Sequence, residues 1–69
     1  MKNYIRELRD ELGLTQQYLA DKVKVSRQTI ISLENGKYNP SIFLAYKIAK
    51  VFSRTIEEVF IFEEDNNEC

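Results

Sequence analysis

Two short helix patterns separated by only two residues constrain this chain more than any other feature. The first pattern opens on Thr15 and the second on Ser26. Both residue types are common at helix starts, because their hydroxyl oxygens accept hydrogen bonds from free N–H groups. Only Lys24 and Val25 remain between the patterns. Two helices of about eight residues joined so closely are expected to cross steeply. The stretch 15–36 therefore predicts a helix-turn-helix.

The second of these predicted helices divides into an inward and an outward face. Ile30 and Leu33 lie three residues apart and point inward, as do Leu19, Ala20 and Val23 of the first helix. The residues left wholly or partly outward include Arg27, Gln28, Thr29 and Ser32. In a helix-turn-helix the second helix presents its N-terminal residues to the major groove of DNA. We therefore expect these four residues to contact bases, Arg27 and Gln28 most directly.

The chemistry of this outward face agrees with DNA recognition. Arginine binds guanine O6 and N7 with two donors, glutamine pairs with adenine N6 and N7, and threonine or serine serves either base or touches a thymine methyl group. A solvated face without this role would carry more glutamate and lysine. No carboxylate occurs between Asp21 and Glu34, and a carboxylate there would repel phosphate. Glu34 itself is expected to be an internal partner of an arginine or of a backbone N–H group.

The stretch LGLTQQYLADKVKVSRQTIISLENGKYNPS can be compared with known families. Its specific positions are Leu12-Gly13-Leu14-Thr15-Gln16, Leu19-Ala20, Val25-Ser26, Ile30, Leu33-Glu34-Asn35-Gly36 and Asn39-Pro40-Ser41. In this order the stretch resembles the phage Cro and repressor family of helix-turn-helix transcriptional regulators, also called the XRE family. The resemblance covers residues 5–60, most of the chain. Lys24 departs from it, because the family commonly has glycine at this turn.

The resemblance implies a set of contacts with the DNA backbone. The residues expected to make them are Gln16, Ser26, Asn35, Lys37, Tyr38 and Asn39. The helix start at Gln16 adds a partial positive charge suited to phosphate. Three alternatives stay open: Gln16 as a polar first-turn residue only, Asn35 as a helix C-cap, and the Tyr38 ring packed under its loop. Backbone contacts fix the register on DNA but carry no sequence information.

The remaining chain predicts three more helices around the motif. The first covers residues 3–12, with Ile5, Leu8 and Leu12 inward, and ends at Gly13. A fourth helix begins after Ser41. A short fifth helix runs from Ile56 to about residue 60, after a capping-box pattern at 55–58. The expected fold is all-α, a compact five-helix lambda-repressor-like domain over residues 1–62, with the option of a short C-terminal strand. The acidic residues 63–69 are expected to be disordered.

Ile61 and Phe62 exceed what a core of this size needs. Val59 and Phe60 are expected to close the core, which leaves the next two residues for a surface patch. Exposed apolar patches usually mark interfaces, so we expect Ile61 and Phe62 to form an isologous dimer contact. The alternative is that both fold back onto the first helix. A homodimer presents its two DNA-reading (recognition) helices about 34 Å apart, which suits a palindromic operator. The expected function is repression, in which the bound dimer occludes polymerase.

Composition excludes several other classes of protein. The chain has no histidine and a single cysteine, Cys69, so enzyme active sites, metal sites and an internal disulfide are not expected. No cofactor, small molecule or membrane partner is indicated, and a reducing cytoplasm fits the lone thiol. Residues 1–56 carry ten basic and five acidic residues, so the body is basic although the whole chain has a net charge of −1. The main rival function is a protein-interaction module, such as the antitoxin of a toxin–antitoxin pair.

Overall fold

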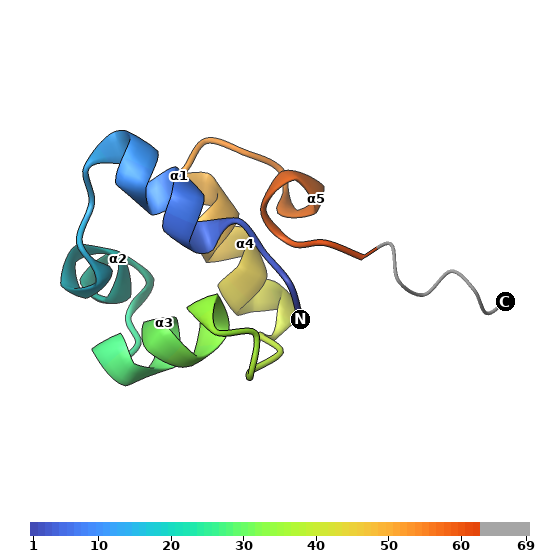
Figure 1. Cartoon of the computed structure of the whole chain (residues 1–69), viewed down its shortest axis with the longest axis horizontal. Coiled ribbons are helices and arrows are strands. Elements are labelled where there is room, and N and C mark those ends of the chain that lie inside the picture. Colours follow the sequence, from blue (N-terminus) through green and yellow to red (C-terminus); the bar gives the residue numbers. More distant parts are fainter. Residues whose placement is uncertain (63–69) are drawn as a thin grey trace, which may run out of the picture.

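The computed structural model describes residues 1–62, and they form five helices (Figure 1). The helices are α1 (Ile5–Leu12), α2 (Gln16–Val23), α3 (Arg27–Glu34), α4 (Ile42–Val51) and α5 (Ile56–Val59). The predicted all-α, five-helix architecture is confirmed. The expectation of disorder for residues 63–69, and any role of Cys69, lie outside the described residues. Within residues 1–62, no helix has the length and apolar character needed to cross a membrane.

Side-chain caps define where four of the helices begin. In each case a serine or threonine hydroxyl accepts a hydrogen bond from the backbone N–H three residues later, which satisfies a group that lacks an intrahelical partner. The capping residues are Thr15 for α2, Ser26 for α3, Ser41 for α4 and Thr55 for α5. At α5 the Glu58 carboxylate also accepts from the Thr55 N–H at 2.9 Å, which completes the predicted capping box.

Four helix ends use a residue in the left-handed conformation. Gly13 and Gly36 follow α1 and α3 with φ angles of 70° and 75°, and glycine adopts this region without strain. Lys24 and Ser53 follow α2 and α4 with φ angles of 65° and 57°. A residue with a side chain is strained in this region by about 1 kcal/mol. Lys24 therefore adopts, in spite of its side chain, a left-handed conformation that favours glycine.

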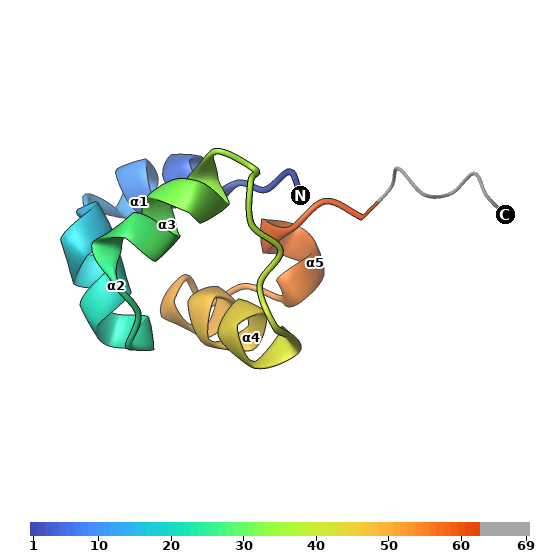
Figure 2. The same cartoon turned by 90° about the horizontal axis from the view of Figure 1, so that it is seen from below.

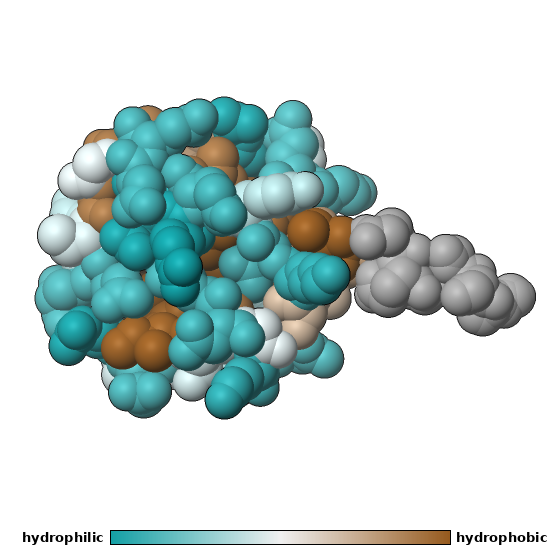
Figure 3. All heavy atoms as spheres, viewed as in Figure 1, coloured by the Kyte–Doolittle hydropathy of each residue, from teal (hydrophilic) through white to brown (hydrophobic). Residues whose placement is uncertain are grey.

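The hydrophobic core lies between α4 and the other helices. Helix α2 packs against α3 and α4, α1 packs against α3, and α5 packs against α4. Figure 2 shows α1 and α3 on one side of the core and α4 on the other. The face seen in Figure 1 is mainly hydrophilic, and its apolar areas are separated by polar side chains (Figure 3). The buried residues are Ile5, Leu8, Leu19, Ala20, Val23, Ile30, Leu33, Leu44, Ala45, Ile48, Ala49, Phe52, Val59 and Phe60.

The N-terminal segment differs from the prediction. Helix α1 begins at Ile5, not at residue 3, because Asn3 pairs with Phe60 in an antiparallel β-bridge. Two backbone hydrogen bonds flank the bridge: the Tyr4 N–H donates to the Val59 carbonyl at 2.8 Å, and the Ile61 N–H donates to the Lys2 carbonyl at 2.9 Å. The optional C-terminal strand is thus reduced to this single bridge. The segment after α5 folds against residues 2–4, just before α1.

Leu12 is a second correction in α1. It was expected to point inward with Ile5 and Leu8, yet more than half of it is exposed. Helix α1 ends at Leu12, and the left-handed Gly13 then turns the chain toward α2. Leu14 takes the inward place instead and packs partly buried against the core. Burial in α1 therefore ends at Leu8, about one helical turn earlier than the spacing predicts.

Candidate nucleic-acid interface

The C-terminal end of α3 is fixed by backbone hydrogen bonds. The Gly36 N–H donates to the Leu33 carbonyl and the Lys37 N–H to the Ser32 carbonyl, both at 3.0 Å. This pair of bonds is a Schellman motif, and it sets the direction in which the following loop leaves the helix. The Asn3 side-chain amide also donates to the Leu33 carbonyl, at 2.8 Å. The end of α3 is therefore tied to the N-terminal segment.

Glu34 holds α3 to both α1 and α2. Its Oε2 accepts from Arg9 Nε at 2.8 Å, and its Oε1 accepts from Gln16 Nε2 at 3.1 Å. The Glu34 side chain is only 1% exposed and that of Arg9 13%. The hydrogen bond to Glu34 raises the pKa of the Arg9 guanidinium against the opposing effect of burial, so Arg9 stays charged. This confirms that Glu34 is an internal partner of an arginine.

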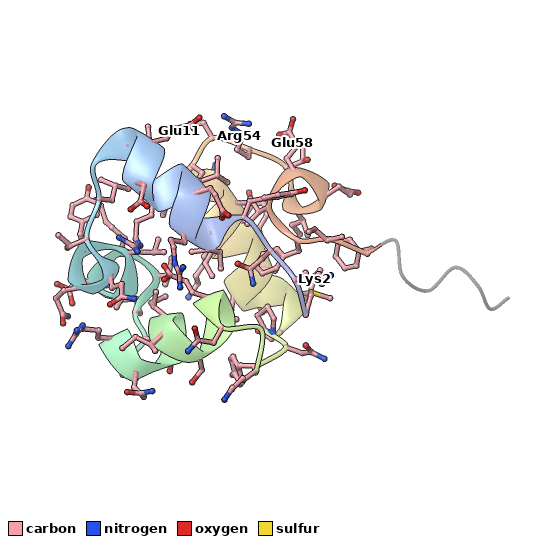
Figure 4. All side chains as sticks on the ribbon, in the orientation of Figure 1. Lys2, Glu11, Arg54 and Glu58 are labelled. Atoms are coloured by element: carbon pink, nitrogen blue, oxygen red, sulfur yellow. The ribbon has the colours of Figure 1, made fainter. Side chains whose placement is uncertain are left out.

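Arg6 Nε also lies 3.8 Å from Glu34 Oε1, but its side chain is 61% exposed. One further arginine–glutamate pair lies in a different environment. Arg54 Nη2 lies 3.8 Å from Glu11 Oε1, and both side chains are largely exposed. Figure 4 shows the two residues together at the edge of the molecule, on the opposite side from α3. Exposed pairs of this kind contribute about 0–1 kcal/mol to stability. The buried pair of Arg9 with Glu34 therefore contributes more to the position of α3 than this exposed pair does.

The residues predicted to contact bases lie along the exposed side of α3. Arg27 and Gln28 are exposed, in the first turn of the helix. Thr29 is half-buried, and its hydroxyl lies 3.0 Å from that of Ser26, which caps the helix. Ser32 is half-buried one turn further on. The structure thus brings the four residues onto one helix, with the two longest side chains most accessible.

The predicted backbone-contacting residues occupy the starts of two helices and one loop. Gln16 begins α2, and its side-chain amide donates to Glu34. Asn35 caps α3, so the C-cap alternative describes its backbone, while its side chain is exposed. Lys37 and Asn39 are exposed in the loop, and Tyr38 is nearly half exposed, so its ring is not packed under the loop. In both Figures 1 and 2 α2 lies beside the start of α3, and the loop 36–40 continues from its end.

Sequence reasoning missed three features of this region. It did not identify Arg9 as the partner of Glu34, because the chain has four arginines and the pair is separated by 25 residues. It did not foresee the contact of Asn3 with the end of α3, and it left the exposed face of α4 unassigned. A usable signal for the last was present: residues 42–52 read IFLAYKIAKVF, which has more apolar residues than one buried stripe requires. Within residues 1–62 no group of acidic, histidine or cysteine side chains is arranged to hold a metal ion.

Comparison with known proteins connects this geometry to a family. The sequence model of the helix-turn-helix family matches residues 5–59. A protein of Archaeoglobus fulgidus described as an uncharacterized HTH-type transcriptional regulator is 57% identical over 65 residues, which cover 94% of this chain and 93% of that protein. The competence pilus inhibition repressor of Acinetobacter baylyi is 41% identical over 63 residues, which cover 88% of this chain and 56% of that protein.

A solved structure shows the same arrangement of helices. The crystal structure of the restriction-modification controller protein C.AhdI from Aeromonas hydrophila superimposes with a TM-score of 0.75 and 32% sequence identity. The match covers 81% of this chain and 85% of the controller protein. The lambda-repressor-like fold is therefore confirmed. With a family match over most of its length and a five-helix fold around a capped recognition helix, the chain belongs to the Cro and repressor (XRE) family of helix-turn-helix transcriptional regulators.

Proposed function

We propose that this protein is a sequence-specific repressor that binds a palindromic operator as a homodimer. The observation that carries the proposal is the burial of Glu34. It is the only acidic residue of α3. Arg9 and Gln16 donate hydrogen bonds to its carboxylate on the core side of the helix. The outward side of α3 therefore offers a guanidinium, one amide and two hydroxyls to DNA, with no negative charge opposed to phosphate.

In this proposal the first turn of α3 reads the bases. Arg27 and Gln28 have the reach for two-donor or donor–acceptor pairing in the major groove. Thr29 and Ser32 are shorter and half-buried, so they contribute through close contacts with thymine methyl groups or single hydrogen bonds. Each good paired contact discriminates against the wrong base by about 1–3 kcal/mol.

The backbone contacts are assigned to α2, the cap of α3 and the loop. Gln16 Nε2 carries two hydrogens, and Glu34 uses one, so the second is available to a phosphate oxygen. The ion-pair network thereby orients the amide that contacts DNA. Ser26 lies at the start of α3, and Asn35, Lys37, Tyr38 and Asn39 lie at its end, so phosphates on both sides of the groove are within the proposed contact set.

The dimer in this proposal uses the segment after α5. Ile61 is half-buried and held by its backbone to Lys2, while about half of Phe62 is exposed. Two copies related by a two-fold axis would match the two-fold symmetry of a palindrome. We favour repression over activation of transcription for two reasons. A bound dimer excludes polymerase from an overlapping promoter, and the related Acinetobacter baylyi protein is named a repressor.

A selection experiment tests the proposal. Random duplex DNA is incubated with the full chain at about 0.15 M salt, since affinities depend on salt. The bound sequences are determined, and the mass of the complex is measured alongside. We expect a palindrome with half-sites about one helical turn apart, bound by two chains. Failure to enrich any sequence, together with binding that disappears as salt rises, would contradict specific operator binding.

Repression is tested separately with the selected sequence. The operator is placed over a promoter in a purified transcription reaction, and transcript yield is measured as the protein is added. A matched template carries the operator with both half-sites scrambled. We expect loss of transcript from the first template only. Increased transcript from the operator template would show that the protein activates.

A further inference from the structure

The side chain of Asn3 uses both of its donor hydrogens and its oxygen within the protein. Its Oδ1 accepts a hydrogen bond from the Ile5 N–H at 3.1 Å, at the start of α1. Its Nδ2 donates to the Leu33 carbonyl at 2.8 Å and to the Met1 carbonyl at 3.1 Å. An amide nitrogen carries two hydrogens, so neither is left for a further acceptor. One half-buried side chain therefore joins α1, the last turn of α3 and Met1.

The Leu33 carbonyl lies where the chain leaves α3. The last carbonyls of a helix lack partners within it. The Leu33 carbonyl accepts from the Gly36 N–H at 3.0 Å as well as from Asn3. A further bond acts on the loop itself, because the Met1 nitrogen donates to the Gly36 carbonyl at 3.0 Å. Residues 37–39 are exposed, so burial does little to hold them. The position of the loop 36–40 therefore depends on hydrogen bonds at the end of α3 and at the first residues of the loop.

Asn3 is itself held by the segment that follows α5. Its backbone pairs with Phe60 in the antiparallel bridge, and Phe60 is only 1% exposed. Next to the bridge the Ile61 N–H donates to the Lys2 carbonyl at 2.9 Å. In both Figure 1 and Figure 2 the N-terminal segment lies beside the end of α3 and the segment after α5. The amide that reaches α3 thus extends from a backbone that is fixed to the core.

We propose that Asn3 is a positioning residue for the DNA backbone contacts of the loop 36–40. It does not contact DNA itself, since both of its donor hydrogens are used within the protein. It keeps the end of α3 and the loop where Lys37 and Asn39 meet phosphates. This role rests on the proposed function, which assigns those two residues to the DNA backbone, and it adds a residue that acts through them.

The effect of Asn3 is confined to one end of α3. Arg27 and Leu33 lie in the first and last turns of the helix, about 9 Å apart along its axis. The first turn is held separately, by the cap at Ser26. Loss of the Asn3 donors should therefore weaken phosphate contacts and leave the base preference unchanged. Phosphate contacts carry no sequence information, so operator and random DNA should be affected alike.

The test uses two variants of Asn3 that both lack the amide donors but differ in stability. In Asn3→Ser the hydroxyl can still accept from the Ile5 N–H, as serine does at helix starts, but it has one hydrogen and ends one bond nearer the backbone than the amide nitrogen. Asn3→Ala also loses the acceptor, so it should unfold more readily in urea than Asn3→Ser. Val51→Ala is the control, because it lowers stability through the core at the end of α4 that lies away from the loop.

Affinities for the selected operator and for a random duplex are measured by fluorescence anisotropy at about 0.15 M salt. We expect Asn3→Ser and Asn3→Ala to lose affinity by the same factor on both duplexes, on the order of 3- to 10-fold, which is the range of one lost hydrogen bond. Val51→Ala should bind both duplexes as tightly as the wild type. Circular dichroism of each variant checks that the helices are intact at the temperature of the titration.

A double-mutant cycle identifies the residue through which Asn3 acts. Asn3→Ser should cost less affinity in a Lys37→Ala background than in the wild type, whereas its effect should add fully to that of Arg27→Ala. Amide resonances give a second measurement that needs no DNA. In Asn3→Ser the resonances of Gly36 and of residues 37–39 should shift, and that of Arg27 should not.

Three outcomes would overturn the inference: wild-type DNA affinity in both Asn3 variants, full additivity with Lys37→Ala, or losses of affinity that follow the stabilities of the three variants. Failure of the proposed function gives a different result. If the wild type enriches no sequence, specific operator binding is wrong, and Asn3 is judged on the random duplex and on the loop resonances. If an operator is selected and the Asn3 variants bind it like the wild type, the role of Asn3 is wrong and operator binding stands.

Discussion

Replacement of Glu34 by alanine tests how the recognition helix is held in place. The substitution removes the acceptor of Arg9 Nε and of Gln16 Nε2. It leaves a guanidinium that is only 13% exposed with the exposed carboxylate of Asp10, 3.7 Å from Nη1, as its remaining ion-pair partner. Removal of one partner from a buried ion pair costs about 3–5 kcal/mol. Arg9 keeps its hydrogen bond to the Leu14 carbonyl at 2.9 Å, so we expect the lower part of this range, about 3–4 kcal/mol.

This loss is large for a chain of this size. Domains are stable by roughly 0.05–0.15 kcal/mol per residue, which gives about 3–10 kcal/mol for 69 residues. The Glu34→Ala variant is therefore expected to lose from a third to all of its stability. In a domain of this length 1 kcal/mol corresponds to about 4–8 °C, so the midpoint of thermal unfolding should fall by about 12–30 °C.

The assay is urea and thermal unfolding followed by circular dichroism, at equal protein concentrations because dimerisation adds to stability. Glu11→Ala is the control: it also removes a glutamate paired with an arginine near a helix end, but the pair is exposed and its loss should cost about 0–1 kcal/mol. The double variant Arg9→Ala/Glu34→Ala should recover part of the loss, since no charge is then left unpaired. If Glu34→Ala and Glu11→Ala unfold within about 1 kcal/mol of each other, Glu34 does not anchor α3 as described.

Three further predictions follow from the site and the helix ends. Arg27→Ala should weaken binding to the selected operator by about 1–3 kcal/mol and relax the base preference at one position. Lys37→Ala should weaken binding to all DNA sequences alike and reduce the slope of log affinity against log salt by about one unit. Fluorescence anisotropy titrations on operator and random duplexes check both, and equal losses on the two DNAs from Arg27→Ala would contradict its role in base recognition. Ser53→Gly should stabilise the fold by about 0.5–1 kcal/mol in urea unfolding, because glycine relieves the left-handed strain at φ 57°. Gly13→Ala should destabilise the fold, because it places a side chain at φ 70°. Phe62→Asp should produce monomers in sedimentation, and an unchanged mass would exclude Phe62 from the dimer contact.

The helices and most of the core were predictable because their signals are local. Thr15, Ser26, Ser41 and Thr55 each mark a helix start, and each caps the helix it was expected to cap. The buried stripe of α4 follows directly from helical spacing. A short connection between two capped helices then leaves few ways to arrange the motif. This is why the motif could be located from residue types alone.

The errors occur where distant residues decide the structure. Asn3 looks like a helix residue until its bridge with Phe60 is known, and no local pattern contains that pairing. The choice of Arg9 for Glu34 likewise depends on how α1 crosses α3. At α4 the buried stripe was predicted, but no local pattern assigned a role to the exposed Ile42 and Phe43 on the same helix. The roles of the individual DNA-facing residues stay predictions.

The separation of the two sides of α3 has a consequence for how such a protein acquires new targets. The residues that hold the helix are Ile30, Leu33 and Glu34, and none of them is among those assigned to the bases. Exchange of Arg27 or Gln28 therefore removes no core contact and no ion pair. Mutations that alter target choice should be nearly neutral for folding, so a lineage can drift between operators without passing through unfolded intermediates. The eight residues of α3 thus divide into one set that stabilises the fold and another that can change with little effect on stability.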